Sequence, residues 1–394
     1  MENKTFCSVL WNHQMVDGTG RVKPCCRFLE DHRPKNHTLD NHSIQDIFDS
    51  DFQNDLRERV LRGERLEGCR RCYEEEDNNK KSLRMRLNEH TKVGEKHVDT
   101  NDNKLEYLEL SLSNDCNLMC RMCDSRYSFK LFDEEQEYHG KTFSKTKRTK
   151  ANLDSIYPHL KDMKYIKFTG GEPLIIPDHW TLLEYAVEKG YAKNIELEYS
   201  INMTVVPQRT LDTIEQFKFV KLCCSVDGYG EVNEAIRHPT KWSVVEKNLD
   251  LLDLAPDNSS VFTSTTVSIL NIEHFVSWME WLKQREFDKI NKDTFAGVVS
   301  HPVMNPKYLN LRLMTDEQNK RMFDHLRSCS TDDDMIEKLN QWEMYSKKLP
   351  MTEDEIVQGR KDLERFFSKM SLIQNKDWSK IFPMCYRMIQ EWNE

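Results

Sequence analysis

Short apolar runs alternate with amphipathic stretches between residue 104 and about residue 305, and these are the periodicities of strands and helices. The strand-like runs lie near 105–112, 164–169, 194–201, 219–226, 260–268 and 294–300. The clearest helical stretches lie at 178–189, 207–217, 241–253 and 272–287. Strands that alternate with helices are typical of βα units that build a parallel sheet. The pattern therefore predicts an α/β core of six βα units.

Local signals mark the ends of some of these elements. We expect Asp178 to be the N-cap of the helix at 178–189 and Gly190 to end it. Before the core, residues 43–62 carry apolar side chains at helical spacing, and Asp17 to Gly20 predict a tight hairpin turn. After the core, helices are predicted at 315–328, 332–347 and 352–373.

These patterns divide the chain into four expected parts. Residues 77–102 are rich in Asn, Lys, Glu and Arg, which predicts a polar helix and a linker. The expected parts are a small cysteine-rich domain at 1–80, a linker at 81–103, the α/β core at 104–305 and a helical C-terminal segment at 306–394.

Three cysteines follow the first predicted strand of the core. They are Cys116, Cys120 and Cys123, in C-x3-C-x2-C spacing. Three thiolates within eight residues can converge on one soft metal centre. A structural zinc site takes four ligands, whereas an iron–sulfur cluster with three protein ligands leaves one iron open. The spacing therefore indicates an open cluster, or else a zinc knuckle with a fourth ligand elsewhere.

Further residues suited to ligand binding follow the other predicted strands. They are Gly170, Gly171, Glu172 and Pro173 after the second strand, Asn202 after the third, Ser225 and Asp227 after the fourth, and His301 after the sixth. In βα folds the chemistry lies at the carboxyl ends of the strands. Paired glycines let the backbone approach a ligand closely, and an acidic side chain can pair with an ammonium group. We therefore expect these residues to open onto one face.

The cysteine spacing, together with Gly-Gly-Glu-Pro about fifty residues later, resembles the radical S-adenosylmethionine (SAM) enzymes. The resemblance implies a partial (β/α)6 barrel in which Cys116, Cys120 and Cys123 hold a four-iron–four-sulfur cluster. In that family the open iron chelates SAM, and one electron cleaves SAM to a 5′-deoxyadenosyl radical that abstracts hydrogen from a substrate. An electron donor such as flavodoxin or ferredoxin is implied as a partner.

The resemblance also implies roles in holding SAM for residues outside the cysteine triplet. Gly170 to Pro173 match the motif that binds the SAM amino group. Asn202, Ser225 and Asp227 resemble contacts to the ribose and methionyl parts, and Arg237 resembles an arginine that pairs with the carboxylate, which its forked donors suit. Met122 stands where many relatives place an aromatic residue against the adenine. The alternative for Asn202, Ser225, Asp227 and Arg237 is an ordinary surface or turn role.

A second set of cysteines lies in the N-terminal part. Cys7, Cys25, Cys69 and Cys72, with Gly20 between the first two, resemble the twitch form of the SPASM domain, which holds an auxiliary iron–sulfur cluster through four cysteines. The resemblance implies a second cluster, placed here before the core, whereas relatives usually carry the domain after it. Cys26 is an alternative ligand to Cys25, and a structural zinc site is the alternative to the cluster.

Composition narrows the class of protein. The chain has 394 residues, a net charge of −9 and 12 cysteines, with no signal-peptide pattern and no run of eighteen apolar residues. We therefore expect a cytoplasmic protein without membrane contact, in which clustered cysteines bind metal rather than form disulfides. The acidic balance disfavours wholesale nucleic-acid binding. The basic run at 145–150 indicates a solvated loop, or a lid over an anionic substrate.

The expected function is radical SAM chemistry on a peptide or protein side chain, within a wider class that includes small-molecule substrates. Modification of a nucleotide or nucleic acid is the alternative among enzymes. A non-catalytic zinc-binding interaction protein is the alternative outside them.

Overall fold

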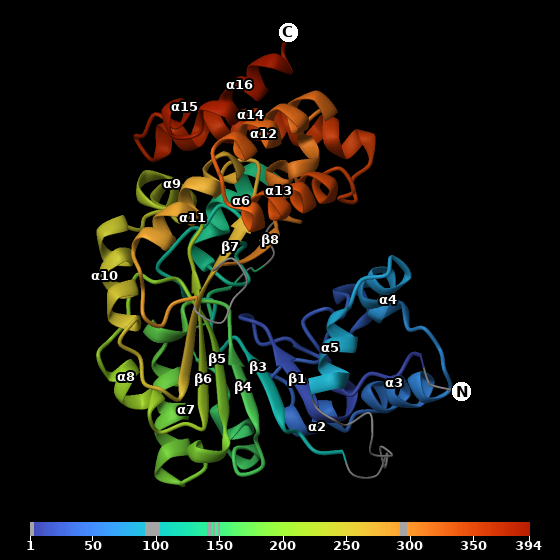
Figure 1. Cartoon of the computed structure of the whole chain (residues 1–394). Helices are drawn as coiled ribbons and strands as arrows, with labels where there is room; N and C mark the ends of the chain where they lie inside the picture. The colour runs from blue at the N-terminus through green and yellow to red at the C-terminus, as the bar shows by residue number, and fades with distance from the viewer. Residues whose placement is uncertain (1–3, 91–102, 140–143, 145, 149, 292–297) are drawn as a thin grey trace. The chain divides into compact units, whose positions relative to one another are not determined.

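The computed structural model describes residues 4–90, 103–139, 144, 146–148, 150–291 and 298–394 (Figure 1). Within these residues the strands form one sheet in the order β2-β1-β3-β4-β5-β6-β7-β8. The strands are β1 His13–Val16, β2 Val22–Lys23, β3 Tyr107–Leu110, β4 Tyr165–Phe168, β5 Glu196–Ile201, β6 Phe219–Ser225, β7 Ser259–Val267 and β8 Val298–Pro302. The sheet runs from β2 to β8 without closing, which confirms the predicted α/β fold with an open barrel.

The six predicted core strands correspond to β3 to β8, in sequence order across the sheet. Part of the run predicted at 294–300 lies outside the described residues. The pairs β3–β4, β4–β5 and β7–β8 are parallel, as βα units require. Within each of these pairs the carboxyl ends of the two strands lie at the same edge.

The first strand of the chain, β1, was not predicted. It pairs parallel with β3, with His13 opposite Tyr107, and antiparallel with β2. All four of its residues are buried, so the alternation that identifies a half-buried strand is absent from its sequence. The hairpin turn predicted at Asp17 to Gly20 is confirmed between β1 and β2, and Gly20 has a φ of +82° there.

The helices of the core agree with the sequence pattern, with one error at a helix start. They are α7 Pro177–Glu188, α8 Arg209–Ile214, α9 Gly230–Ile236, α10 Trp242–Leu252 and α11 Phe275–Gln284. The prediction that Asp178 caps α7 is wrong, because Pro177 takes the first helical position and Ile176 is the cap. Asp178 instead accepts a hydrogen bond from the Ala151 amide at 2.6 Å. Gly190 ends the helix as predicted, with a φ of +73°.

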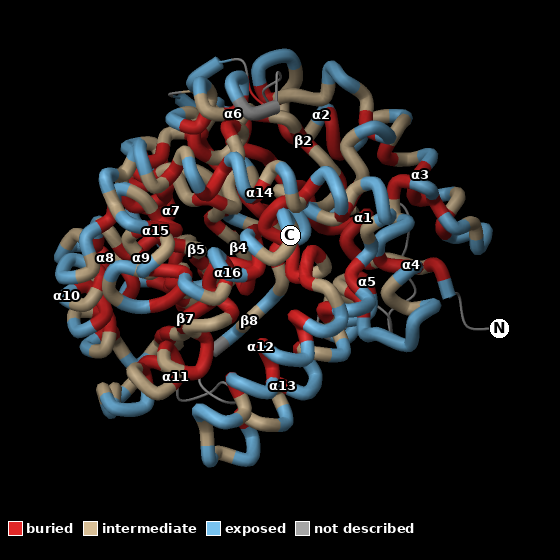
Figure 2. The backbone as a smooth tube through the Cα atoms, turned by 90° about the horizontal axis from the view of Figure 1, so that it is seen from above, coloured by how far each residue is buried: buried red, intermediate tan, exposed pale blue. Residues whose placement is uncertain are grey.

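The remaining helices lie on either side of the core in the sequence. Before and early in it are α1 Val9–Asn12, α2 Ile44–Phe48, α3 Asp51–Leu61, α4 Arg70–Asp77, α5 Leu83–His90 and α6 Phe132–His139. After it come α12 Asp316–Ser328, α13 Asp333–Ser346, α14 Glu353–Ile373, α15 Trp378–Ile381 and α16 Pro383–Glu391. Figure 2 shows how buried and exposed positions alternate along such helices; α14 buries a stripe that runs from Ile356 to Met370.

The chain divides into two compact units. The first contains Met1–Asn117, Asp124–Ser200 and Pro207–Lys221, and the second contains Leu118–Cys123, Ile201–Val206 and Leu222–Glu394. Cys116 therefore belongs to the first unit, and Cys120 and Cys123 belong to the second. The four-part division expected from the sequence remains a prediction. None of the described helices has the length and apolarity needed to span a membrane.

Candidate functional site

The Gly-Gly-Glu-Pro motif packs backbone to backbone against residues on either side of the cysteine triplet in the sequence. The Gly171 amide donates to the Tyr127 carbonyl at 2.8 Å, and the Glu172 amide donates to the Asp115 carbonyl at 3.0 Å. Gly171 has a φ of +59°, and a Cβ there would lie 2.6 Å from the Ser113 carbonyl oxygen. Only glycine fits such a position, because a side chain would be strained and would clash with backbone.

The side chain of Glu172 is turned inward in this structure. It is only 1% exposed, and its carboxylate accepts a hydrogen bond from the Leu174 amide at 3.3 Å. Pro173 begins the 3₁₀ turn Pro173–Ile175 that this carboxylate caps. The role of Glu172 toward an ammonium group stays a prediction.

Asn114 fixes the loop before Cys116, and the sequence analysis did not single it out. Its Nδ2 donates to the Thr146 carbonyl at 3.0 Å and to the Ser125 carbonyl at 3.2 Å, and its Oδ1 accepts from the Arg148 amide at 2.8 Å. A buried asparagine with this role has the same sequence signature as an exposed turn asparagine. The loop is therefore held by long-range bonds that no local motif reveals.

Part of the basic run lies against the same loop. Lys147 Nζ is 2.9 Å from the Asp115 carboxylate, and the Ser113 hydroxyl donates to the Arg148 carbonyl at 2.5 Å. Residues 145 and 149 of the run lie outside the described residues. Its role as a lid over an anionic substrate stays a prediction.

In the second unit, the segment Leu118–Cys123 is bonded to the end of α9. The Met119 amide donates to the His238 carbonyl at 2.6 Å, and the Arg121 amide donates to the Ile236 carbonyl at 2.9 Å. The Cys123 amide bonds the Cys120 carbonyl at 3.0 Å, which makes a turn between the two cysteines. These bonds place Cys120 beside Arg237.

Arg237 joins Cys120 to Asp227. Its Nη1 lies 3.8 Å from Cys120 Sγ, and its Nε lies 2.7 Å from Asp227 Oδ2. Burial raises the pKa of the Cys120 thiol, and the charge of Arg237 opposes that rise. Burial disfavours the charged guanidinium, but Asp227 and Cys120 outweigh it and hold the pKa of Arg237 above its usual value. Arg237 therefore offsets part of the effect of burial on Cys120, in the direction of the thiolate that ligates metal.

Asp227 is itself held rigidly at the end of β6. Its Oδ1 accepts from the Thr266 amide at 2.7 Å, its amide donates to Asn233 Oδ1 at 3.0 Å, and its carbonyl accepts from Asn271 Nδ2 at 3.0 Å. Asn233 and Asn271 were not predicted. Two of the predicted SAM contacts, Asp227 and Arg237, thus meet each other here, and their contact with SAM stays a prediction.

The other predicted site residues lie at or near strand ends, except Met122. Asn202 is buried and its Oδ1 accepts from the Thr204 amide at 3.0 Å, which forms a turn after β5. Ser225 is the last residue of β6, and Met122 is half-buried in the cysteine turn. His301 lies on β8, with its Nε2 3.3 Å from the Thr266 hydroxyl.

The C-terminal helices contact this part of the site. Arg121 is 3% exposed, and its guanidinium contacts the Met370 thioether of α14. Gln374 Nε2 donates to the Ala235 carbonyl of α9 at 3.0 Å. The end of α14 therefore supports both the cysteine turn and the helix that leads to Arg237.

The N-terminal cysteines form a second site in the first unit. Cys7, Cys25, Cys69 and Cys72 line one small cavity, together with Arg84 and apolar side chains. Cys7 lies in the turn before α1, Cys25 follows β2, Cys69 precedes α4 and Cys72 lies on α4. Three segments that are distant in sequence thus bring four thiols to one place.

The four thiols are close enough to influence one another. Burial raises the pKa of Cys25 to about 12, and the neighbouring Cys7 thiol adds to the effect. Burial also raises the pKa of Cys7 to about 12, while Arg84 opposes the rise. Cys26 does not line the cavity, and its thiol bonds the Glu109 carboxyl instead. Of the two adjacent cysteines, the geometry favours Cys25 as the ligand.

Helix α5 holds the Cys7 turn in place. Arg84 donates to the Phe6 carbonyl at 2.6 Å and pairs with Glu76 of α4. Asn88 donates to the same carbonyl at 3.0 Å and accepts from the Ser8 amide at 2.8 Å. The two helices therefore clamp the cysteine-bearing turn from one side.

The donor chemistry of this second site fits an iron–sulfur cluster. Four soft thiols face one cavity, beside a cation that stabilises negative charge. Over the described part of the chain, no group of three His, Cys, Asp or Glu side chains has the arrangement that holds a single metal ion.

Comparison with known proteins identifies two domains. The radical SAM superfamily profile matches residues 110–282, and that of an iron–sulfur cluster-binding domain, SPASM, matches residues 7–73. GTP 3′,8-cyclase of Psychromonas ingrahamii is 34% identical over 87 residues, which are 22% of this chain and 23% of that protein. The match thus spans less than a quarter of this relative.

Solved structures with a similar arrangement are more distant in sequence. Native anSMEcpe with bound AdoMet is 14% identical with a TM-score of 0.39, over 69% of this chain and 63% of that one. SuiB of Streptococcus suis, bound to the precursor peptide SuiA, is 13% identical with a TM-score of 0.39, over 61% and 51% of the two chains. The cofactors of the two matched domains are a four-iron–four-sulfur cluster with SAM and a further iron–sulfur cluster. The chain therefore carries a radical SAM domain and, before it, a SPASM iron–sulfur cluster-binding domain.

Proposed function

We propose that this protein cleaves SAM reductively and uses the resulting radical to abstract hydrogen from a peptide or protein side chain. The observation that carries the proposal is the contact of Arg237 with Cys120 at 3.8 Å, held by Asp227. It sets a buried cation beside one of the three cysteines of the C-x3-C-x2-C motif. A cation there favours the thiolate that a cluster needs.

Different residues of the chain would hold the catalytic cluster and SAM. Cys116, Cys120 and Cys123 would hold the catalytic cluster, and Gly170 and Gly171 let their motif pack closely against the loop before Cys116, where SAM would bind. When bound, the cluster and SAM supply a 5′-deoxyadenosyl radical. Arg237 offers its remaining donors to a carboxylate, while Asp227 keeps its guanidinium in one orientation.

The N-terminal site would hold the auxiliary cluster through Cys7, Cys25, Cys69 and Cys72. Four protein ligands leave no open iron, so this cluster would serve as a structural element or as an electron relay. A small electron-transfer protein such as flavodoxin or ferredoxin would supply the electron.

A peptide or protein substrate is favoured by the SPASM domain, whose relatives often modify peptides. The net charge of −9 opposes binding of an extended polyanion. A nucleotide is the second candidate, because part of the chain is similar to GTP 3′,8-cyclase. Salt-sensitive binding to DNA or RNA would favour the nucleic-acid alternative instead.

Isotope transfer tests the proposal. Anaerobic protein is incubated with SAM, reductant and candidate peptides that carry deuterium on their side chains, and 5′-deoxyadenosine is analysed by mass spectrometry. Deuterium in that product supports the proposal, and its loss in Cys120→Ala but not in the exposed Cys329→Ala assigns the cysteine. No 5′-deoxyadenosine from a protein that contains zinc and no sulfide would establish the non-catalytic alternative.

A further inference from the structure

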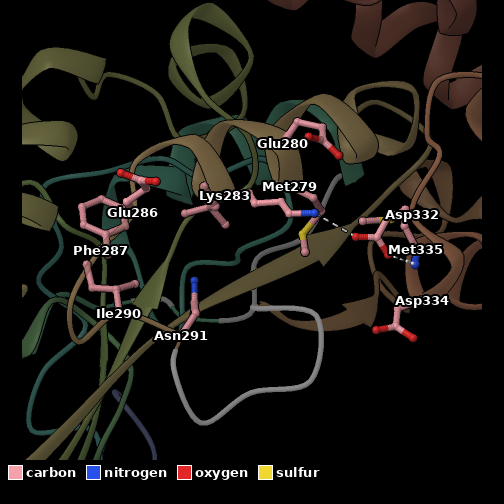
Figure 3. Close-up of a pocket in the computed structure, with 11 residues that line it drawn as sticks. Met279, Glu280, Lys283, Glu286, Phe287, Ile290, Asn291, Asp332, Asp334 and Met335 are labelled. Atoms are coloured by element: carbon pink, nitrogen blue, oxygen red, sulfur yellow. Dashed lines mark hydrogen bonds and ion pairs between the residues drawn. The ribbon is translucent and has the colours of Figure 1, made fainter.

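A cavity of about 350 Å³ lies in the second unit, where α11, the segment 285–291 and the start of α13 meet (Figure 3). No residue of the proposed radical site lines it. Figure 3 shows Lys283 of α11 reaching Asp332, the residue that caps α13, and the two charged groups are 3.0 Å apart. The cavity is large enough for a long amino-acid side chain.

The segment that forms one wall is fixed by hydrogen bonds. The Asp253 carboxylate accepts from the amides of Asp288 at 2.8 Å, Lys289 at 2.7 Å and Ile290 at 3.1 Å. Asn291 Oδ1 accepts from the Thr263 amide of β7 at 2.8 Å. The opposite wall is fixed in a similar way, because Asp332 accepts from the Met335 amide at 3.1 Å. The cavity is therefore preformed, and a ligand would not have to order its walls.

The lining combines an apolar floor with an acidic rim. The floor is made by buried Met279, Leu282, Ile290 and Met335, with Phe287 at its side. The charged lining residues are the four acids Glu280, Glu286, Asp332 and Asp334 and the single base Lys283. The formal charge of the lining is therefore −3, and the one cation is already paired with Asp332.

We propose that this cavity binds a lysine or arginine side chain of the peptide or protein substrate. Such side chains bury an aliphatic stem against apolar surface and keep a cationic head in a polar rim. The floor matches the stem, and Glu280, Glu286 and Asp334 match the head. An anionic ligand would meet the negative rim, and a bare metal ion would gain nothing from the apolar floor.

This inference rests on the proposed function, because it assigns a lysine or arginine side chain to the peptide or protein substrate of that function. The site would anchor the substrate through a residue that does not react. Binding energy from such a remote contact can help to position the reacting residue.

Calorimetric titration of the anaerobic holoenzyme tests the proposal. The probe is acetyl-Gly-Ser-Lys-Ser-Gly-amide, compared with versions that carry arginine, norleucine or glutamate in place of lysine. We expect the lysine or arginine peptide to bind at least tenfold more tightly than the norleucine peptide, and more weakly as salt rises. Equal binding of the lysine and norleucine peptides would overturn the proposal.

Two variants provide the matched comparison. The triple variant Glu280→Gln, Glu286→Gln, Asp334→Asn should weaken binding of the lysine peptide at least tenfold. The control Glu184→Gln, Glu188→Gln, Glu215→Gln changes the net charge by the same amount at exposed positions of the first unit. Its affinity for the lysine peptide should stay within twofold of that of the wild type. If both triple variants bind the lysine peptide as the wild type does, the cavity is not the site.

A charge-reversal variant distinguishes loss of the negative charge from misfolding of the cavity. Glu286→Lys should lose the lysine peptide and gain measurable affinity for the glutamate peptide, which requires a folded cavity. Because these titrations do not involve SAM cleavage, their failure would leave the proposed function standing. If the lysine peptide binds as expected but the enzyme forms no 5′-deoxyadenosine, the proposed function would be contradicted and the cavity proposal would stand.

Discussion

Arg237 Nη1 lies 3.8 Å from Cys120 Sγ, and the same guanidinium is paired with Asp227 at 2.7 Å. All three side chains belong to the second unit, and Asp227 is almost completely buried. A buried cation is stable only while its paired carboxylate remains in place. Replacing Arg237 therefore changes the charge beside Cys120 without removing a cysteine ligand of the cluster.

Arg237→Met should retain the iron of the catalytic cluster and lower SAM-dependent formation of 5′-deoxyadenosine at least tenfold. It removes the forked donors and leaves the Asp227 carboxylate buried without its cation, at a cost of about 3–5 kcal/mol. Arg237→Lys keeps the charge without the fork and should lie between wild type and Arg237→Met. Full activity in Arg237→Met, with unchanged affinity for SAM in equilibrium binding, would remove Arg237 from the proposed site.

Gly171→Ala should abolish SAM binding while the auxiliary cluster remains. The φ of +59° disfavours alanine, and its Cβ would lie 2.6 Å from the Ser113 carbonyl, next to the loop of Cys116. The backbone strain alone costs about 1–3 kcal/mol. Gly190→Ala is the control, because that glycine also has a positive φ but has open space around it. Equal SAM affinity in the two variants would show that close packing of the motif is unimportant.

Cys25→Ser and Cys26→Ser should differ in iron content. Cys25 lines the N-terminal cavity and Cys26 bonds Glu109, so only the first change removes a ligand of the auxiliary cluster. We expect Cys25→Ser to lose about four irons and Cys26→Ser to keep them. Loss of iron in Cys26→Ser alone would reverse the assignment.

The local motifs could be identified from the sequence because each is a short pattern with its own chemistry. The cysteine triplet and Gly170-Gly171 occur at the ends of strands that periodicity also identified. The residues that hold them could not be identified in this way. Arg121 and Met370 are 249 positions apart, and Asn114 bonds residues whose positions relative to it depend on the fold.

Errors in the secondary structure have equally physical causes. β1 was missed because burial on both faces removes alternation, and Asp178 was misjudged as a cap because Pro177 already fixes the helix start. Helix α9, which carries Asn233 and leads to Arg237, has only seven residues, too few for a helical period to be visible.

The docking of the last helix should depend on pH through Glu273. Its carboxyl accepts from the amides of Met384 at 2.9 Å and Cys385, and burial raises its pKa to about 7. Because the folded-state pKa is above the ordinary value, the protonated form is favoured on folding. The contribution of Glu273 to the free energy of unfolding is complete below about pH 4.5. It falls by up to about 3 kcal/mol as the pH rises through about 7.

Thermal unfolding at pH 5 and pH 8 measures this effect. The difference in Tm between the two pH values should be larger for wild type than for Glu273→Gln, which cannot ionise. The exposed Glu215→Gln serves as a control and should behave like wild type. A pH dependence of Tm that is identical in wild type and Glu273→Gln would show that this carboxyl does not titrate in the expected range.

Iron and sulfide quantitation after anaerobic purification counts the clusters in the two cysteine sites. It compares wild type with the triple variant Cys116→Ala, Cys120→Ala, Cys123→Ala. Two four-iron clusters in separate sites predict about eight irons in wild type and about four in the variant. About four irons in wild type and none in the variant would contradict the account of the N-terminal site, and an unchanged iron content in the variant would contradict the account of the catalytic cluster.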